Sequence, residues 1–258
     1  MKIGIYNKRS ILSSLLTVIS FISVIPIPSR LLPKWTPDNL RHFPVMLPVA
    51  GLVFGAFWLI LWQVLSSLPA VSPILRGFMM MLLTLALTGG LHLDGLMDTC
   101  DAIFSHRDRD TRLKILSDTH TGSFAVICCV VVLMAKTLLF SELLTHGVHP
   151  LTLSFIPVYS RLGMALLLTN LPFAKPSGLA ATLGASRSKR DNIPLVMILL
   201  ALSFLSTGII TAMMILCLVL HVIICVKIFG GITGDLLGAF VEVSEVIMLF
   251  GMVIVSCI

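Results

Sequence analysis

The chain alternates long apolar blocks with short polar breaks, and the blocks lack amphipathic spacing. A helix of roughly 20 apolar residues crosses the hydrocarbon core of a bilayer, which is about 30 Å thick. The pattern therefore predicts an all-α fold, a polytopic transmembrane helical bundle. It does not show the alternating short strands of a transmembrane barrel. The apolar blocks are 11–27, 43–68, 74–93, 124–144, 151–171, 193–229 and 236–258.

Two of these blocks differ from a single span. The block 193–229 is long enough for two helices, which we expect to meet near Ser206, Thr207 and Gly208. The block 11–27 carries hydroxyl side chains along one helical face. Such a stripe is typical either of a helix that lies in or re-enters the membrane interface, or of a spanning helix packed on a neighbour. The stripe consists of Ser10, Ser13, Ser14, Thr17 and Ser20.

The distribution of basic residues favours the first alternative. If 11–27 does not cross, the basic segments 1–42, 94–122 and 172–192 all fall on one side, which the positive-inside rule makes cytoplasmic. The sequence then predicts about seven spanning helices plus an N-terminal interfacial or re-entrant helix, in a single domain over 1–258. The acidic residues of 94–118 and the segment 230–235, which carries Asp235, then lie at the cytoplasmic ends of helices and share this surface.

Composition agrees with a membrane protein and limits the classes of partner that we expect for it. Of the 258 residues, 57% are hydrophobic and only 12% are charged, which is unlike soluble domains. The net charge of +6 is a topology signal in such a chain, so we expect the lipid bilayer as a partner and no nucleic acid. The six cysteines form no CxxC pair and are expected to be packing residues.

Three aspartates gather in the stretch GGLHLDGLMDTCDAIF, residues 89–104. On a helix, Asp94, Asp98 and Asp101 form a stripe about 60° wide. Like charges at that spacing need a counter-charge, and Mg²⁺ answers that need because it takes one or two carboxylates plus phosphate oxygens and water. A solvated polar face at a helix end is the alternative. Asp118, in the next polar segment, is either a further ligand or a helix N-cap.

The last block places acids inside an apolar helix, in GGITGDLLGAFVEVSE, residues 230–245. Asp235, Glu242 and Glu245 share a face with glycines, which would admit a close neighbour. Acids within a membrane helix indicate function by default, and the alternative is a buried pair neutralised by Lys136 or Arg161. Those two cations would hold the fold if paired, or bind an anionic ligand if they face a cavity. Together these features predict a Mg²⁺-competent site suited to phosphoryl transfer.

These motifs resemble the cobalamin synthase family, the adenosylcobinamide-GDP ribazoletransferases. Besides the two stretches quoted above, SDTHTG at 117–122, FISVIPIPSR at 21–30, LPVAGLVFGAF at 47–57, Lys136, Ser160-Arg161 and the segment from Lys175 are similar. The resemblance implies a multi-pass enzyme of the bacterial inner membrane whose active site faces the cytoplasm. In the implied reaction, a hydroxyl of α-ribazole or its 5′-phosphate attacks adenosylcobinamide-GDP. GMP leaves, and adenosylcobalamin or its 5′-phosphate forms with Mg²⁺ as cofactor.

The resemblance also implies residue roles. Asp94, Asp98 and Asp101 would be catalytic and hold Mg²⁺ against the diphosphate, with Asp98 as a candidate proton acceptor. Asp118 or Asp235 would complete the metal shell. The expected substrate-binding residues are His120, Lys136, Arg161, Lys175, Glu242 and Glu245.

Two positions depart from the family's pattern. Ala102 stands where relatives usually have glycine, and Thr119-His120 stand where an arginine usually follows the Asp-Ser pair. A histidine binds phosphate less strongly than arginine near neutral pH. The resemblance leaves open a homo-oligomer and association with other cobalamin-assembly enzymes.

Two other functions compete with this prediction. A CDP-alcohol phosphotransferase of lipid synthesis also uses clustered aspartates, but its DxxDG motif followed by AR does not match residues 98–104. A secondary transporter should show paired repeats and a midplane site, and the sequence shows no repeat.

Overall fold

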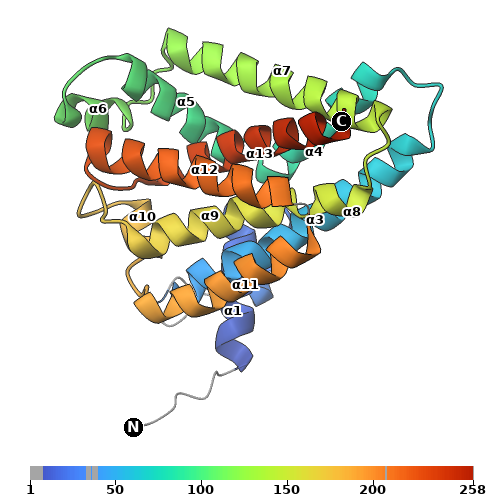
Figure 1. Cartoon of the computed structure of the whole chain (residues 1–258). Coiled ribbons are helices and arrows are strands. Elements are labelled where there is room, and N and C mark those ends of the chain that lie inside the picture. The colour runs from blue at the N-terminus through green and yellow to red at the C-terminus, as the bar shows by residue number, and fades with distance from the viewer. Residues whose placement is uncertain (1–7, 33–35, 37–39, 207, 258) are drawn as a thin grey trace.

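The computed structural model describes residues 8–32, 36, 40–206 and 208–257. Lys2, Lys34 and Thr207, which contributed to the predicted topology, lie outside the described residues. Every regular element in the described part of the chain is helical, as predicted (Figure 1). The helices are α1 (Lys8–Ile22), α3 (Phe43–Ser66), α4 (Pro73–Thr88), α5 (Leu91–Phe104), α6 (Arg109–Ile115), α7 (Ser123–Thr145), α8 (Pro150–Ser154), α9 (Ile156–Asn170), α10 (Leu179–Leu183), α11 (Asn192–Leu205), α12 (Gly208–Ile224) and α13 (Gly234–Ser256), with the short helical segments η1 (Ser29–Leu31), η2 (Lys189–Asp191) and π-helical η3 (Cys225–Phe229).

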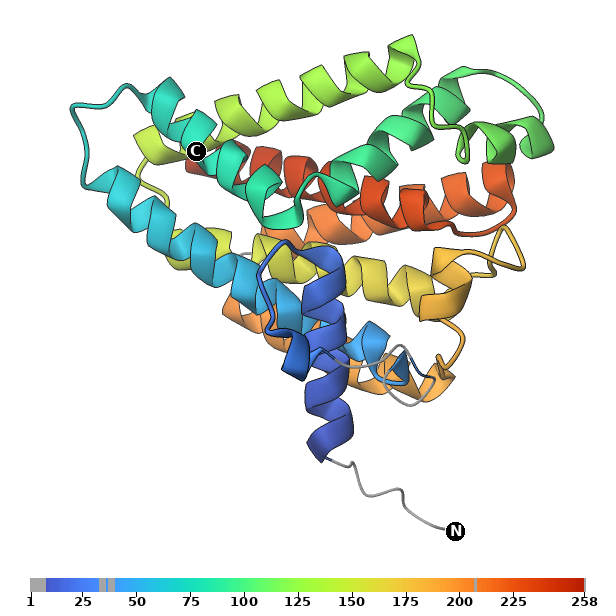
Figure 2. The same cartoon turned by 180° about the vertical axis from the view of Figure 1, so that it is seen from behind.

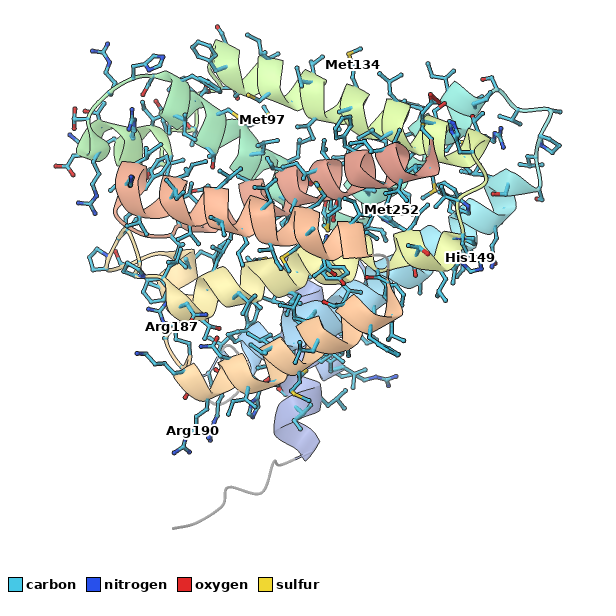
Figure 3. All side chains as sticks on the ribbon, viewed as in Figure 1. Met97, Met134, His149, Arg187, Arg190 and Met252 are labelled. Carbon is cyan, nitrogen blue, oxygen red and sulfur yellow. The ribbon has the colours of Figure 1, made fainter. Side chains whose placement is uncertain are left out.

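The core of the bundle lies around α9, in which thirteen of fifteen residues are buried. Helices α3 and α13 pack directly on α9, and α12 packs on α13. Helix α7 covers α4 and α5 from outside, so only five of its 23 residues are buried. Its outer face carries apolar side chains such as Met134, which is 58% exposed (Figure 3). An apolar outer surface on an apolar helix is the pattern of a membrane-embedded bundle.

The structure confirms a polytopic bundle but not the count of about seven spans. Among the described residues, five helices are long and apolar enough to cross a membrane, or six if the bent pair α4 and α5 is one span. Helix α11 has 14 residues, which at 1.5 Å per residue is about 21 Å and short of the roughly 30 Å core. The five are Phe43–Ser66, Ser123–Thr145, Pro150–Asn170, Gly208–Phe229 and Gly234–Ser256.

Two predictions about the apolar blocks agree with the structure. The long sixth block is divided, because α11 ends at Leu205 and α12 begins at Gly208. The apolar part of α1, Ile11–Ile22, is shorter than a span. Helix α1 also runs across the bundle helices rather than along them, as both views show (Figures 1 and 2).

A sharp bend separates α4 from α5 and was not predicted. The two helices meet at 92°, and Gly89 and Gly90 make the turn with φ of 60° and 81°. This left-handed region is readily adopted by glycine. The N–H of Val24 donates to the carbonyl of Leu87 (3.0 Å), so the segment after α1 closes the end of α4. The bend directs α5 and its aspartates along α13.

One end of the bundle collects the segments that carry the predicted site (Figures 1 and 2). The end of α5, α6, α10 and the start of α13 lie there together. Arg109 ties these segments by donating to the carbonyls of Phe229 (2.8 Å) and Ala174 (3.3 Å). Backbone bonds from Ala174 to Ile232 (2.9 Å) and from Ile232 to Pro172 (2.8 Å) hold the two loops side by side.

We expect Gly51→Ala to destabilise the fold, because a Cβ there would lie 2.7 Å from the carbonyl oxygen of Pro157 at the α3–α9 contact. Overpacking of this kind costs about 1–3 kcal/mol. Gly208→Ala is the matched control, since nothing lies within 4 Å of a Cβ at that position. Melting temperatures of the variants in detergent would test this, and equal values for Gly51→Ala and the wild type would contradict the packing.

Candidate functional site

The site is built on a close contact between α5 and α13. A Cβ on Gly95 would lie 2.8 Å from the carbonyl oxygen of Asp235, and one on Gly238 would lie 3.1 Å from that of His92. The two backbones therefore touch, as the glycine face of the last helix predicts. This contact sets Asp94 beside Asp235, although 141 positions separate them in the chain (235 minus 94).

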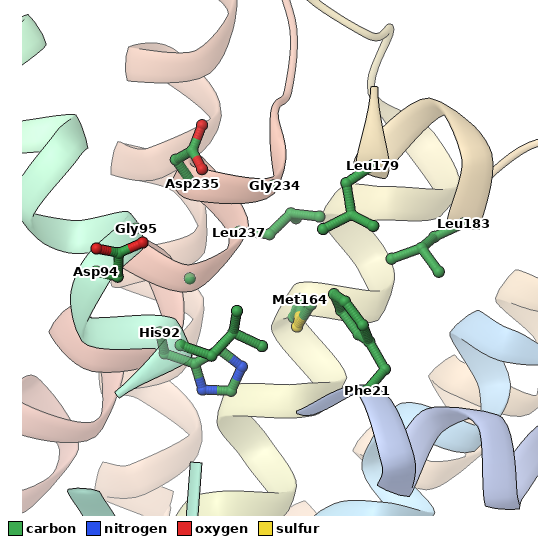
Figure 4. Close-up of a pocket in the computed structure, with 12 residues that line it drawn as sticks. Phe21, His92, Asp94, Gly95, Met164, Leu179, Leu183, Gly234, Asp235 and Leu237 are labelled. Atoms are coloured by element: carbon green, nitrogen blue, oxygen red, sulfur yellow. The ribbon is translucent and has the colours of Figure 1, made fainter. Parts of the chain in front are cut away.

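The first pocket, of about 60 Å³, opens beside this contact (Figure 4). Asp94, Asp235 and His92 form its polar side. Its opposite wall is apolar and comes from α1, α9, α10 and α13. The apolar lining includes Phe21, Met164, Leu179, Leu183 and Leu237.

The second pocket, of about 220 Å³, adjoins the first because Asp235 lines both. Lys175 and Ser117 line it and are hydrogen bonded to each other. The start of α13 also faces it, where the hydroxyl of Thr233 accepts from the N–H of Leu236 (3.3 Å). A helix N-terminus, an ammonium group and hydroxyls together favour a phosphate group.

The carboxylates of the predicted stripe lie near one another. Asp94, Asp101 and Asp235 are close enough to Asp98 to interact with it electrostatically, and Asp98 is half-buried. Within the described residues, no three His, Cys, Asp or Glu side chains are arranged to hold a metal ion by themselves. The donor set nevertheless fits Mg²⁺, which needs only one or two carboxylates when phosphate and water supply the rest.

The carboxylate of Asp101 has hydrogen-bond partners in the backbone at the start of α7. It accepts from the N–H groups of Gly122 (2.6 Å) and Ala125 (2.9 Å), so it caps the start of α7 from 21 residues away. The alternative that Asp118 is this N-cap is therefore wrong. Asp118 instead accepts from the N–H and ring Nδ1 of His120 (3.1 and 2.6 Å) in an exposed turn.

Four predicted substrate-binding residues form a buried ion-pair network that lies outside the lining of both pockets. Lys136 of α7 donates to Glu242 (2.8 Å) and Glu245 (2.7 Å) of α13, and Arg161 of α9 pairs with Glu245. All four are buried, and none lines either pocket. This geometry matches the alternative in which the cations hold the fold, and a substrate-binding role for them stays a prediction.

Sequence reasoning missed several pocket residues. Thr233 and Gly234 line the second pocket together with Ser177. A threonine that precedes an apolar run is a recognisable helix N-cap signal, so Thr233 could have been found. Ser117 belongs to a quoted motif but was not expected to contact Lys175. Of the predicted residues outside the ion-pair network, Lys175, Asp94 and Asp235 line pockets, whereas Asp98, Asp101, Asp118 and His120 do not.

The fold and site define a polytopic membrane protein with a pocket whose lining suits an anion, beside a cluster of carboxylates. The chain belongs to the cobalamin-5-phosphate synthase family, whose model matches residues 14–253. The resemblance seen in the motifs is thereby confirmed.

Curated relatives match over most of the chain. A protein of Clostridium botulinum (strain Alaska E43 / Type E3) is 29% identical over 249 residues, which cover 94% of this chain and 97% of the relative. One of Geobacillus kaustophilus is 35% identical over 232 residues, covering 86% and 88%. One of Geobacillus thermodenitrificans is 34% identical over 251 residues, covering 93% and 95%. All three are named adenosylcobinamide-GDP ribazoletransferase. No solved structure matches the chain.

We expect Lys136→Met to destabilise the protein by about 3–5 kcal/mol, because it leaves Glu242 buried without a counter-charge. Glu245 keeps its partner Arg161 in this variant. The double variant Lys136→Met/Glu242→Leu should recover much of the loss, since it removes the unpaired charge. Thermal unfolding in detergent measures both, and a double variant less stable than the single one would contradict the pairing.

We expect Asp118→Asn to lower the pKa of His120. The hydrogen bond and charge of Asp118 raise the pKa of His120 above 6.5, so the pair is fully formed below that pH and is lost as pH rises through the higher folded value. Histidine NMR titration would show the midpoint falling in Asp118→Asn. Asp108→Asn is the control, because Asp108 bonds Thr111 instead. A His120 midpoint that does not move in Asp118→Asn would rule out the interaction.

Proposed function

We propose that this protein is an adenosylcobinamide-GDP ribazoletransferase of late cobalamin synthesis, acting where its two pockets meet. Family membership and the names of the relatives support the reaction. The structural observation that carries the proposal is Asp235, which lines both the pocket suited to phosphate and the pocket that contains Asp94. A diphosphate in the second pocket would thus lie against the carboxylates.

The proposed reaction joins two substrates at one phosphorus. The oxygen of a ribose hydroxyl on α-ribazole, or on its 5′-phosphate, bonds to the cobinamide-side phosphorus of adenosylcobinamide-GDP. The bond from that phosphorus to the bridging oxygen breaks, and GMP leaves with the electron pair. The hydroxyl proton passes to a nearby carboxylate, with Asp98 as the candidate acceptor.

The chain's own residues supply positioning and charge. Lys175, Thr233 and the N-terminus of α13 would bind the diphosphate oxygens. Asp94 and Asp235, which line the first pocket together, would hold Mg²⁺, which when bound neutralises phosphate charge. Asp101 fixes the start of α7 against α5 through its two amide bonds.

The proposed location is the bacterial inner membrane, with the site facing the cytoplasm. Helix α6 lies at the same end of the bundle as the site (Figure 1) and carries Arg109, Arg112 and Lys114. Basic segments are retained on the cytoplasmic side.

An assay of purified protein in nanodiscs tests the function. With adenosylcobinamide-GDP, α-ribazole and Mg²⁺, the wild type should form adenosylcobalamin, and chelation by EDTA should stop the reaction until Mg²⁺ is restored. Asp94→Asn, Asp98→Asn and Asp235→Asn should each lower kcat on the order of 100-fold or more, because phosphoryl transfer depends on charge neutralisation.

Asp110→Asn is the matched control. Asp110 is an exposed carboxylate on α6 and lines neither pocket, so the variant should keep wild-type activity. A wild type that forms no cobalamin would refute the proposed function. Full activity in Asp94→Asn and Asp235→Asn would refute the proposed site.

A further inference from the structure

His92 is a buried histidine with no hydrogen-bond partner for either ring nitrogen within the described part of the chain. It is 2% exposed and lines the first pocket with Asp94 and Asp235, as Figure 4 shows. Buried polar side chains are nearly always hydrogen bonded. An unpaired imidazole at a pocket wall therefore indicates a group that pairs with a ligand.

No neighbour among the described residues forms a hydrogen bond with the ring of His92, although the ring lies at the wall of the first pocket. Its backbone is fixed against Gly238 of α13. Lys136, Glu245 and Arg161 lie near enough to interact with it electrostatically, but these residues are bonded to one another. His221, another buried histidine, differs because its Nε2 is bonded to the carbonyl of Leu236 (2.8 Å).

The shape and chemistry of the first pocket define the class of ligand. One side carries His92 and Asp94, and the other is apolar. Its volume of about 60 Å³ has room for about four or five water-sized groups, which suits the hydroxyl-bearing edge of a sugar. Because Asp235 also lines the second pocket, a hydroxyl in the first pocket would face a phosphorus in the second.

We propose that His92 binds the acceptor nucleoside by a hydrogen bond between its imidazole and a ribose hydroxyl held in the first pocket. This inference rests on the proposed function and adds a substrate contact to it. The first pocket is then the acceptor site and the second is the donor site. Asp235 stands at their junction.

Steady-state kinetics with both substrates test the contact. In His92→Phe, which keeps a ring but loses both nitrogens, the KM for α-ribazole should rise about tenfold or more. The KM for adenosylcobinamide-GDP should stay near the wild-type value. His92→Gln retains a donor and an acceptor and should recover part of the loss. Calorimetric titration of each protein with α-ribazole measures the same contact without turnover.

Stability measurements separate a binding role from a structural one. His92→Phe should melt at or above the wild-type temperature, because it removes an unpaired buried polar group. His221→Phe is the matched control and should melt lower, since it leaves the carbonyl of Leu236 without its partner.

Each outcome bears on one claim. If the wild type makes cobalamin and His92→Phe keeps the wild-type KM and affinity for α-ribazole, the inference is overturned and the proposed function stands. Equal increases in both KM values with a lower melting temperature would show a structural role and also overturn the inference. A wild type without product removes the proposed function, and the inference with it.

Discussion

The structure depends on the ion pairs that Lys136 and Arg161 form with Glu242 and Glu245. Isolated charges are costly in a membrane bundle and persist when they are paired. Here the pairs join three helices, because Lys136 lies on α7, Arg161 on α9 and both glutamates on α13. Arg161 also lies over the ring of Phe54 on α3, 4.5 Å from its centroid. The network fixes α13 among its neighbours.

The site follows from the position of α13. Backbone contact at Gly95 and Gly238 places α5 against it, and the bend at Gly89 and Gly90 gives α5 the direction it needs. The loop before α13 is held in turn by Arg109 through the carbonyl of Phe229. The chain thus pairs one set of acids with cations inside the bundle and places another set at the end of the bundle, where we propose that the chemistry occurs.

The sequence predicts the helical content and much of the site, but not which charges meet. Apolar blocks predict the bundle and the division of 193–229, and the motifs predict the family. Hydropathy does not register the 92° bend, because 74–93 is apolar through both glycines. The cap of α7 comes from Asp101 rather than from Asp118, and the sequence does not show this for a similar reason. A cap supplied from 21 residues away leaves no local sequence pattern. Whether Lys136 pairs with an acid or faces a ligand depends on which helices lie beside it, and the sequence alone does not give that arrangement.

The two departures from the family's pattern, Ala102 and Thr119-His120, line neither pocket. Ala102 is fully buried inside α5, where alanine favours the helix more than glycine does. His120 is exposed, bonded to Asp118 and outside both pockets. Lys175 and the start of α13 face the second pocket directly, so a weaker cation at position 120 leaves the groups best placed for phosphate unchanged. The histidine that bears most directly on the site is therefore His92, which lines the first pocket.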